Sequence, residues 1–250
     1  MVTTLIAGWV LGWSAQEAPT PVEPPTSTPA ELVSRMLERY SSAKSVTGAI
    51  SLTQTYMGKS ATIDTRLQYE KPGLLYVRQE TRVQNGRTSL VVSNGTFFKY
   101  TLPAEVDGRP GEMLFESLNQ GNKLMTYADV YAAAGRSLVD RSAPLDIVIS
   151  RRDDLRFISG TWINLAWGTP VSMAGQTAWP VTGDWRENQG LNPSGKYTMW
   201  ITATGDLLQY EIREALKLDD RSPAMTMLSV WTVRVEVDGK PDPALFVLPK

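Results

Sequence analysis

Carboxylates are the side chains best suited to acid–base chemistry in this chain, because the sequence contains no histidine and no cysteine. A Ser-His-Asp triad, a Cys-His pair and an imidazole zinc site are therefore excluded. Two adjacent acid pairs remain, Asp153-Asp154 and Asp219-Asp220. Side chains that are neighbours in sequence diverge in a helix or a strand, so neither pair converges on a substrate by spacing alone. We interpret both pairs as solvated surface acids rather than a glycosidase pair, and predict a non-enzymatic protein without cofactor or metal.

The overall charge narrows the class of partner. The formal net charge is -1, from 25 basic and 26 acidic residues, with no long run of either sign. Such a balance predicts no binding to nucleic acid or to an anionic membrane surface. Without cysteine the chain forms no disulfide and carries no lipid on a cysteine. A chain of 250 residues can bury a substantial core, and we predict a single domain over residues 29–250.

The N-terminal region differs in composition from the rest of the chain. Residues 1–15 contain a short apolar stretch, with Gly12 and Ser14 near a possible cleavage point, as in a secretory signal peptide. The stretch is too short to span a bilayer, but no Lys or Arg precedes it, and a disordered apolar tail is the alternative. Residues 16–28 are rich in proline and predict an extended linker. We therefore predict an exported protein, periplasmic or otherwise extracytoplasmic, that is not an integral membrane protein.

Alternation of apolar and polar residues is the main signal for secondary structure. It runs through five short segments between Val46 and Leu102, which are separated by turn signals such as Lys71-Pro72-Gly73. Successive side chains of a strand point to opposite faces, so these segments predict an antiparallel sheet with one half-polar face. The same pattern returns at Tyr197–Thr202, Leu207–Arg213 and Met225–Val237. An all-helical fold is excluded.

Helix signals are few. Thr28-Pro29-Ala30-Glu31 has the form of a capping box with proline at the first helical position, so we predict a helix that starts at Pro29. A second helical region is predicted from about Leu124 to Val139. The short apolar run Leu145–Ile149 is compatible with helix or strand. The first helix has an apolar stripe made of Leu32, Val33, Met36, Leu37 and Tyr40.

Four segments follow one another along the chain: Tyr69–Val77, Val91–Tyr100, Met199–Leu208 and Pro241–Pro249. Together they resemble motifs of the lipoprotein-carrier superfamily that includes LolA, LolB and periplasmic domains of sigma-factor regulators. Tyr69–Val77 is similar to the family's "KPG, aromatic, basic, aromatic" strand, and Val91–Tyr100 to its "VSDG, apolar, Tyr" hairpin. Met199–Leu208 is similar to the "W-I-D...G-L-P" hairpin, and Pro241–Pro249 to the "P-D-x-x-F-x-x-P" ending. The resemblance spans about Pro29 to Pro249.

The resemblance implies a mainly β (α+β) fold, a strongly curved antiparallel half-barrel with helices covering its concave face. In that family the space between sheet and helical lid holds acyl chains. The expected function is binding of a hydrophobic ligand, with a lipid or an acylated lipoprotein as partner. The alternative is a regulatory or scaffold domain that acts through an envelope protein partner. The residues predicted to line the hydrophobic cavity are Leu32, Met36, Ile50, Leu52, Leu67, Tyr69, Tyr76, Trp200, Met227 and Trp231.

Two features qualify the resemblance. In the carrier proper an arginine after the KPG turn helps to latch the lid, and the matching position here is Tyr76, with Arg78 as the nearest substitute. The family's turn aspartate is Asn94 in this chain.

Tryptophans gather in the latter part of the chain, where they either fill a core or line an adaptable cavity. They stand at positions 162, 167, 179, 185, 200 and 231.

Overall fold

The computed structural model describes residues 23–82, 86–101, 113–120, 123–149, 162–185, 195–216 and 225–249. The predicted signal peptide, residues 1–15, lies outside these ranges, as does the first part of the predicted linker. The acid pairs Asp153-Asp154 and Asp219-Asp220 lie outside them too. No helix in the described ranges is long and apolar enough to cross a membrane.

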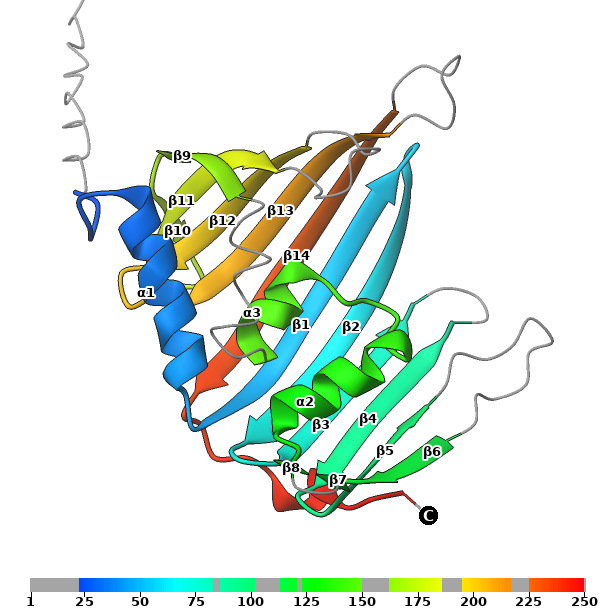
Figure 1. The fold of residues 1–250 in the computed structure, drawn as a ribbon. Helices are drawn as coiled ribbons and strands as arrows, with labels where there is room; N and C mark the ends of the chain where they lie inside the picture. The colour runs from blue at the N-terminus through cyan, green and yellow to red at the C-terminus, as the bar shows by residue number, and fades with distance from the viewer. Residues whose placement is uncertain are drawn as a thin grey trace, which may run out of the picture.

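Twelve strands form one antiparallel sheet in the order β10-β11-β12-β13-β14-β1-β2-β3-β4-β5-β6, and β9 pairs with β11 (Figure 1). The predicted strands are confirmed, and β14 from the end of the chain pairs with β1 from its beginning. The bounds are β1 Ser45–Tyr56, β2 Lys59–Glu70, β3 Leu74–Thr81, β4 Thr88–Asn94, β5 Phe97–Thr101, β6 Met113–Ser117, β9 Trp162–Trp167, β10 Val171–Met173, β11 Gln176–Trp185, β12 Gly195–Thr202, β13 Leu207–Leu216 and β14 Met225–Val237. A separate small ladder joins β7 (Asn119–Gln120) to β8 (Lys123–Leu124).

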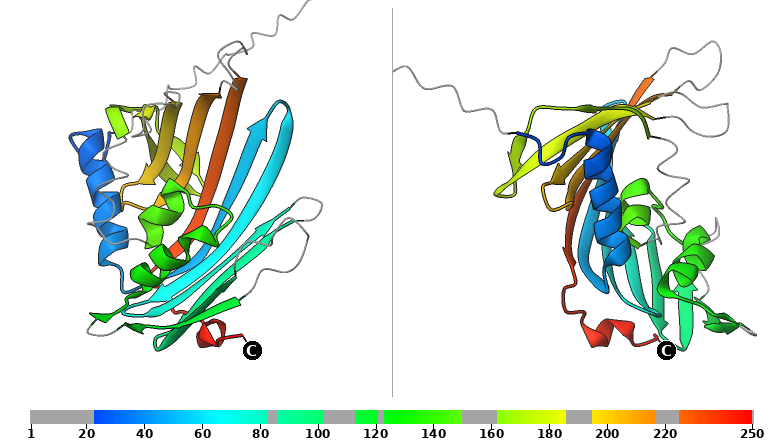
Figure 2. Two further views of the ribbon diagram at one scale, coloured as in Figure 1. Left: turned by 45° about the vertical axis from the view of Figure 1, so that its right-hand side comes forward. Right: turned by 60° about the vertical axis from the view of Figure 1, so that its left-hand side comes forward.

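The sheet is open and is not strongly curled, so the predicted strongly curved half-barrel is wrong. Bulges bend a strand and are the usual means of curling a sheet. The central ladders from β14 through β1, β2, β3 and β4 run without a register shift. Shifts occur in the β11–β9 and β12–β13 ladders, near one edge of the sheet. Long strands in unbroken register twist rather than close (Figure 2).

Three helices lie on one face of the sheet, which we call the inner face, and the opposite face is the outer face (Figures 1 and 2). They are α1 (Pro29–Ser42), α2 (Tyr127–Ala133) and α3 (Ala143–Ile149). Helix α1 contacts β9 and β12, α3 contacts β1, and α2 contacts β3 and β4. The helices therefore cover most of the width of the sheet.

The helix boundaries follow from their caps. The capping box predicted for α1 is confirmed, since Thr28 Oγ1 accepts from the Glu31 N–H and the Glu31 carboxylate accepts from the Thr28 N–H. Helix α2 is shorter than predicted because a second capping box, Thr126 with Asp129, starts it at Tyr127. A 3-10 turn, η1 (Ala134–Arg136), follows it. The ambiguous run Leu145–Ile149 is helical and belongs to α3.

One large hydrophobic core lies between the inner face and the helices. A second, small cluster lies on the outer face, where the 3-10 helix η2 (Pro243–Phe246) packs against β3 and β4. In this cluster Phe246 contacts Tyr76 and Val92. Among the described residues, the inner face is therefore covered across the sheet, and the outer face is covered by η2 near β3 and β4.

Candidate functional site

The inner face brings together most of the residues predicted to line a hydrophobic cavity. Register places Leu52 opposite Trp231, and Met227 lies four residues before Trp231 on the same face of β14. Met227 is half-buried, whereas the others are buried in the main core. The predicted residues on or against the inner face are Leu32, Met36, Ile50, Leu52, Leu67, Tyr69, Met227 and Trp231. That they bind a ligand stays a prediction.

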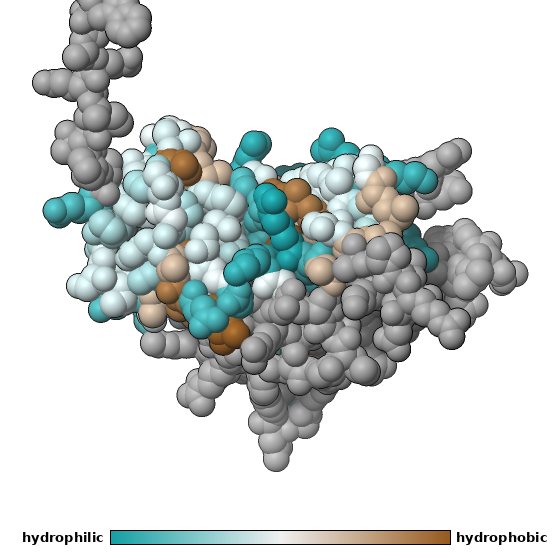
Figure 3. Space-filling model, turned by 90° about the horizontal axis from the view of Figure 1, so that it is seen from above, coloured by the Kyte–Doolittle hydropathy of each residue, from teal (hydrophilic) through white to brown (hydrophobic). Residues whose placement is uncertain are grey.

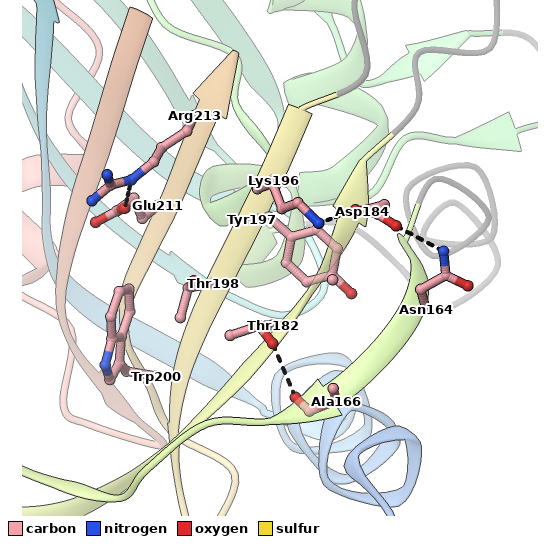
Figure 4. Close-up of a pocket in the computed structure, with 11 residues that line it drawn as sticks. Asn164, Ala166, Thr182, Asp184, Lys196, Tyr197, Thr198, Trp200, Glu211 and Arg213 are labelled. Carbon is pink, nitrogen blue, oxygen red and sulfur yellow. Dashed lines mark hydrogen bonds and ion pairs between the residues drawn. The ribbon is translucent and has the colours of Figure 1, made fainter. Parts of the chain in front are cut away.

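Tyr76 and Trp200 lie on the outer face, so their predicted inward placement is wrong. Tyr76 alternates with the core residues Leu75 and Val77 and joins the outer cluster instead. Trp200 stands between two buried residues of β12 and lines an outer groove of about 640 Å³ (Figure 4). In that groove the Arg213–Glu211 ion pair measures 2.6 Å. Three consecutive large apolar side chains in β12 concealed the alternation that would have placed Trp200 outward.

Side chains fill the space between α1 and the sheet. Leu32 and Met36 of α1 are fully buried, and Leu67 on the inner face of β2 is 1% exposed. The ring of Tyr69 stacks on that of Tyr127 from α2, with centroids 4.4 Å apart and an interplanar angle of 11°. The inner face is therefore closed at these positions, and an acyl chain could enter only if the helices moved.

A crevice of about 370 Å³ opens beside this aromatic stack. It lies between the end of α1, the turn from β2 to β3 and the start of α2. Lys71 stands in it, and its Nζ donates to the Ser41 carbonyl oxygen at 2.9 Å. Burial lowers the pKa of the Lys71 amine below its ordinary value. The crevice therefore leads from the Lys71 amine at its mouth to the aromatic stack in the core. Its lining residues are Glu38, Ser41, Ser42, Lys71, Pro72, Thr126 and Tyr127.

Gln79 on β3 fastens the connection between α2 and α3 to the inner face. Its Oε1 accepts from the N–H groups of Val139 and Asp140, at 2.8 and 3.0 Å. Its Nε2 donates to the Asp140 carbonyl oxygen at 2.7 Å and to Thr65 Oγ1 at 3.1 Å. Sequence analysis missed this residue, although a glutamine that shares a strand face with the apolar residues Leu75 and Val77 is a signal that it has a buried partner.

Asp140 extends this contact to β14. Its Oδ2 accepts from Trp231 Nε1 at 3.1 Å and from Ser142 Oγ at 3.1 Å. Burial raises the pKa of the Asp140 carboxyl, and these two hydrogen bonds offset part of that effect. The middle of the helical layer is thus attached to β3 and β14 through buried polar groups.

Helix α1 is fastened at the other side of the sheet, to the turn between β12 and β13. Arg39 Nε lies 2.6 Å from Asp206 Oδ1, and Arg35 donates to the Ala203 carbonyl oxygen at 2.7 Å. Tyr40 Oη accepts from the Leu207 N–H at 3.1 Å. These contacts fix the middle and the end of α1 against the sheet.

The surface formed by the described residues offers little apolar area. In a view from above, apolar residues form small areas among hydrophilic ones (Figure 3). The exposed large apolar side chains of the described residues are Met57, Leu124, Val171 and Val247, which belong to different segments. Scattered apolar residues of this kind need no functional explanation. No group of three or more acidic residues that could hold a metal occurs in the described part of the chain.

No family model and no curated protein matches this sequence. Solved structures match at low identity. A complex of MucA and MucB from Pseudomonas aeruginosa matches at 13% identity over 88% of this chain and 61% of that chain, with a TM-score of 0.42. The lipoprotein LppX of Mycobacterium tuberculosis matches at 13% identity over 84% of this chain and 99% of that chain, with a TM-score of 0.38. A LolA superfamily protein of Nitrosomonas europaea matches at 10% identity over 89% and 99%, with a TM-score of 0.29.

The resemblance to the LolA superfamily in the sequence thus has counterparts among solved structures. This chain spans less than two thirds of the chain that it matches in the MucA and MucB complex. Because the TM-scores lie below 0.5, these likenesses are distant. What the chain binds is therefore inferred below from its own residues.

Proposed function

We propose that this protein is a non-enzymatic binder of an amphiphile, a lipid or an acylated lipoprotein, whose acyl chain inserts between the inner face of the sheet and the helices. The proposal rests on one observation: the crevice between α1 and α2 leads directly to the Tyr69–Tyr127 stack in the main core. Its volume of about 370 Å³ lies within the range of ligand pockets, roughly 300–1,000 Å³. An extracytoplasmic location is part of the proposal and rests on the apolar stretch in residues 1–15.

The energetics favour such insertion. Each methylene that leaves water gains about 0.8 kcal/mol, so a few buried carbons of an acyl chain outweigh the loss of one neutral hydrogen bond of about 0.5–1.5 kcal/mol. Helix α2 has only seven residues, and the connection from it to α3 is attached to the sheet by the hydrogen bonds of Gln79 and Asp140 in addition to the apolar packing of both helices. An entering chain could therefore displace α2 at a cost that its own burial offsets. Lys71 at the mouth suits an anionic headgroup.

The test is uptake of a dansyl-labelled fatty acid by delipidated protein, followed by fluorescence. We expect one probe per chain. Ser42→Trp places a large ring in the crevice and should lower the affinity at least fivefold. Ser34→Trp is the matched control, because Ser34 is exposed on the same helix and does not line the crevice.

The results separate the alternatives. If the delipidated protein takes up no probe, or if both tryptophan variants bind as the wild type does, the crevice is not the entry. A regulatory or scaffold domain without a lipid ligand would give the first of these results. Native mass spectrometry of protein purified from its own cell envelope would then show a bound protein rather than a bound lipid.

A further inference from the structure

Three arginines form a row across the outer face of the sheet. Register places Arg234 of β14 opposite Ala49 of β1, Ala49 opposite Arg66 of β2, and Arg66 opposite Arg78 of β3. All four side chains are exposed. Like charges directly opposite each other on neighbouring strands destabilise a sheet. The row therefore weakens the fold, and folding alone does not explain it.

The row lines a groove of about 640 Å³. Ala49 forms the floor of the groove, because its short side chain lies between those of Arg234 and Arg66. These two arginines stand two strand spacings apart, roughly 10 Å between Cα atoms. Long side chains on either side of a short one create a recess that has a guanidinium on each wall.

The arginines of the row differ in the ion pairs that they form among the described residues. Arg78 forms an ion pair with Glu80, and Asp64 forms one with Arg82. Within the described ranges neither Arg66 nor Arg234 has an ion pair. Two unpaired guanidinium groups that flank a recess are suited to a carboxylate, which a guanidinium binds through two parallel hydrogen bonds.

The surroundings of the groove decide between a membrane and a protein as the source of that anion. On one side of the row, Asp64 lies two residues from Arg66, and Glu80 lies two residues from Arg78. On the other side, Glu236 lies two residues from Arg234. A flat anionic membrane would press against these acids, and the net charge of -1 gives no general attraction to it. Asp64 and Glu80 line the same groove, but each is paired with an arginine, so a single acidic side chain that enters between Arg66 and Arg234 meets the two guanidinium groups that have no ion pair in the described ranges.

We propose that this groove, with Arg66 and Arg234 as its binding residues, docks an acidic segment of a partner protein. The docking surface is on the face opposite to the crevice of the proposed ligand site, so both can be occupied together. A partner bound here would leave α1, α2 and α3 free to move. The surface does not depend on the identity of the ligand on the inner face.

The test uses a rhodamine-labelled hexaglutamate peptide and the full chain, with binding followed by fluorescence anisotropy at low ionic strength. Arg66→Gln with Arg234→Gln should weaken binding at least tenfold. Arg87→Gln with Arg213→Gln is the control, because it removes the same charge from exposed residues outside the groove. Ala49→Glu, which keeps both arginines and fills the recess with a competing carboxylate, should also weaken binding at least tenfold.

The proposal is overturned if the wild type does not bind the peptide, or if the control pair weakens binding as much as the groove pair. It is also overturned if vesicles of phosphatidylglycerol bind through Arg66 and Arg234 more tightly than the peptide does. Circular dichroism shows whether each variant folds. If the groove pair fails to fold, Ala49→Glu decides, and unchanged binding by that variant rejects the proposal.

Discussion

The side-chain amide of Gln79 pairs with the backbone of Asp140 through two hydrogen bonds of 2.7 and 3.0 Å, much as one strand pairs with the next. Gln79 is fully buried, and Asp140 is half-buried in the connection from α2 to α3. A short helical connection is thereby held to the sheet by polar geometry in addition to apolar packing. This contact determines how readily the helical layer can leave the inner face.

Gln79→Leu should therefore loosen the connection. The change leaves the backbone groups of Val139 and Asp140 without partners, which costs about 1–3 kcal/mol in the free energy of unfolding. Urea denaturation measures the loss, and hydrogen exchange should rise over residues 137–149. Gln209→Leu on the outer face is the control. Equal effects of the two substitutions would show that Gln79 does not hold the helical layer.

Asp140 should make stability depend on pH. Because burial raises the pKa of its carboxyl, the folded protein binds this proton more tightly than the unfolded chain does. Its stabilising contribution is complete below the pKa of an unfolded aspartate, about 3.9, and is lost as the pH rises through the raised pKa. Asp140→Asn keeps an acceptor for Trp231 and removes the charge.

The free energy of unfolding of Asp140→Asn should accordingly rise relative to the wild type between about pH 4 and pH 7. Urea denaturation at both pH values measures this difference. If the free energies of unfolding of Asp140→Asn and the wild type differ by the same amount at both pH values, folding does not change the pKa of the Asp140 carboxyl. All other buried hydrogen bonds are the same in the wild type and in Asp140→Asn, so their contributions cancel in the difference between the two free energies of unfolding.

The sequence was most informative where local chemistry determines structure. The capping box at Thr28 and the proline after it were sufficient to place the start of α1, and turn residues with alternating neighbours located the strands. Tyr76 lies on the outer face because it alternates with the inward residues Leu75 and Val77, and the family motif does not specify the face that its aromatic residue takes. The curl of the sheet could not be predicted, because it depends on register shifts between strands that are distant in sequence.

The polar contacts of the candidate site were harder still to predict. Gln79 and Asp140 are 61 residues apart in sequence. A single glutamine on the apolar face of a strand indicates that it needs a hydrogen-bond partner, but it does not identify that partner. Asp140 itself stands in a short connection and resembles any surface acid. The crevice at Lys71 likewise forms only when α1, α2 and a turn are placed side by side.

Two contacts between α1 and the turn from β12 to β13 should differ in how much they contribute to stability. One is the close approach of Gly205 to α1, and the other is the ion pair of Arg39. Gly205 has a φ of 91°, and a Cβ there would lie 3.2 Å from the Arg35 carbonyl. Gly205→Ala should lower the free energy of unfolding by about 1–3 kcal/mol. Arg39→Gln removes a partly exposed ion pair and should cost only about 0.2–1 kcal/mol. Urea denaturation of both variants checks the order, and the reverse order would contradict this account of the contact.

Trp200 should not contribute to ligand binding. It lies on the outer face, so Trp200→Ala should leave the affinity for a dansyl-labelled fatty acid within twofold of the wild type. Tyr127→Leu removes an aromatic ring from the stack beside the crevice and should weaken binding at least threefold. Fluorescence titration of both variants measures this. A larger effect at Trp200 than at Tyr127 would move the ligand to the outer face.

The most direct measurement is photo-crosslinking with a fatty acid that carries a diazirine near the end of its chain, with the modified residues located by tandem mass spectrometry. A ligand between sheet and helices predicts saturable labelling of inner-face residues such as Leu67 and Trp231, and of Met36 on α1. Labelling confined to outer-face residues such as Tyr76 and Trp200, or no saturable labelling, would contradict it.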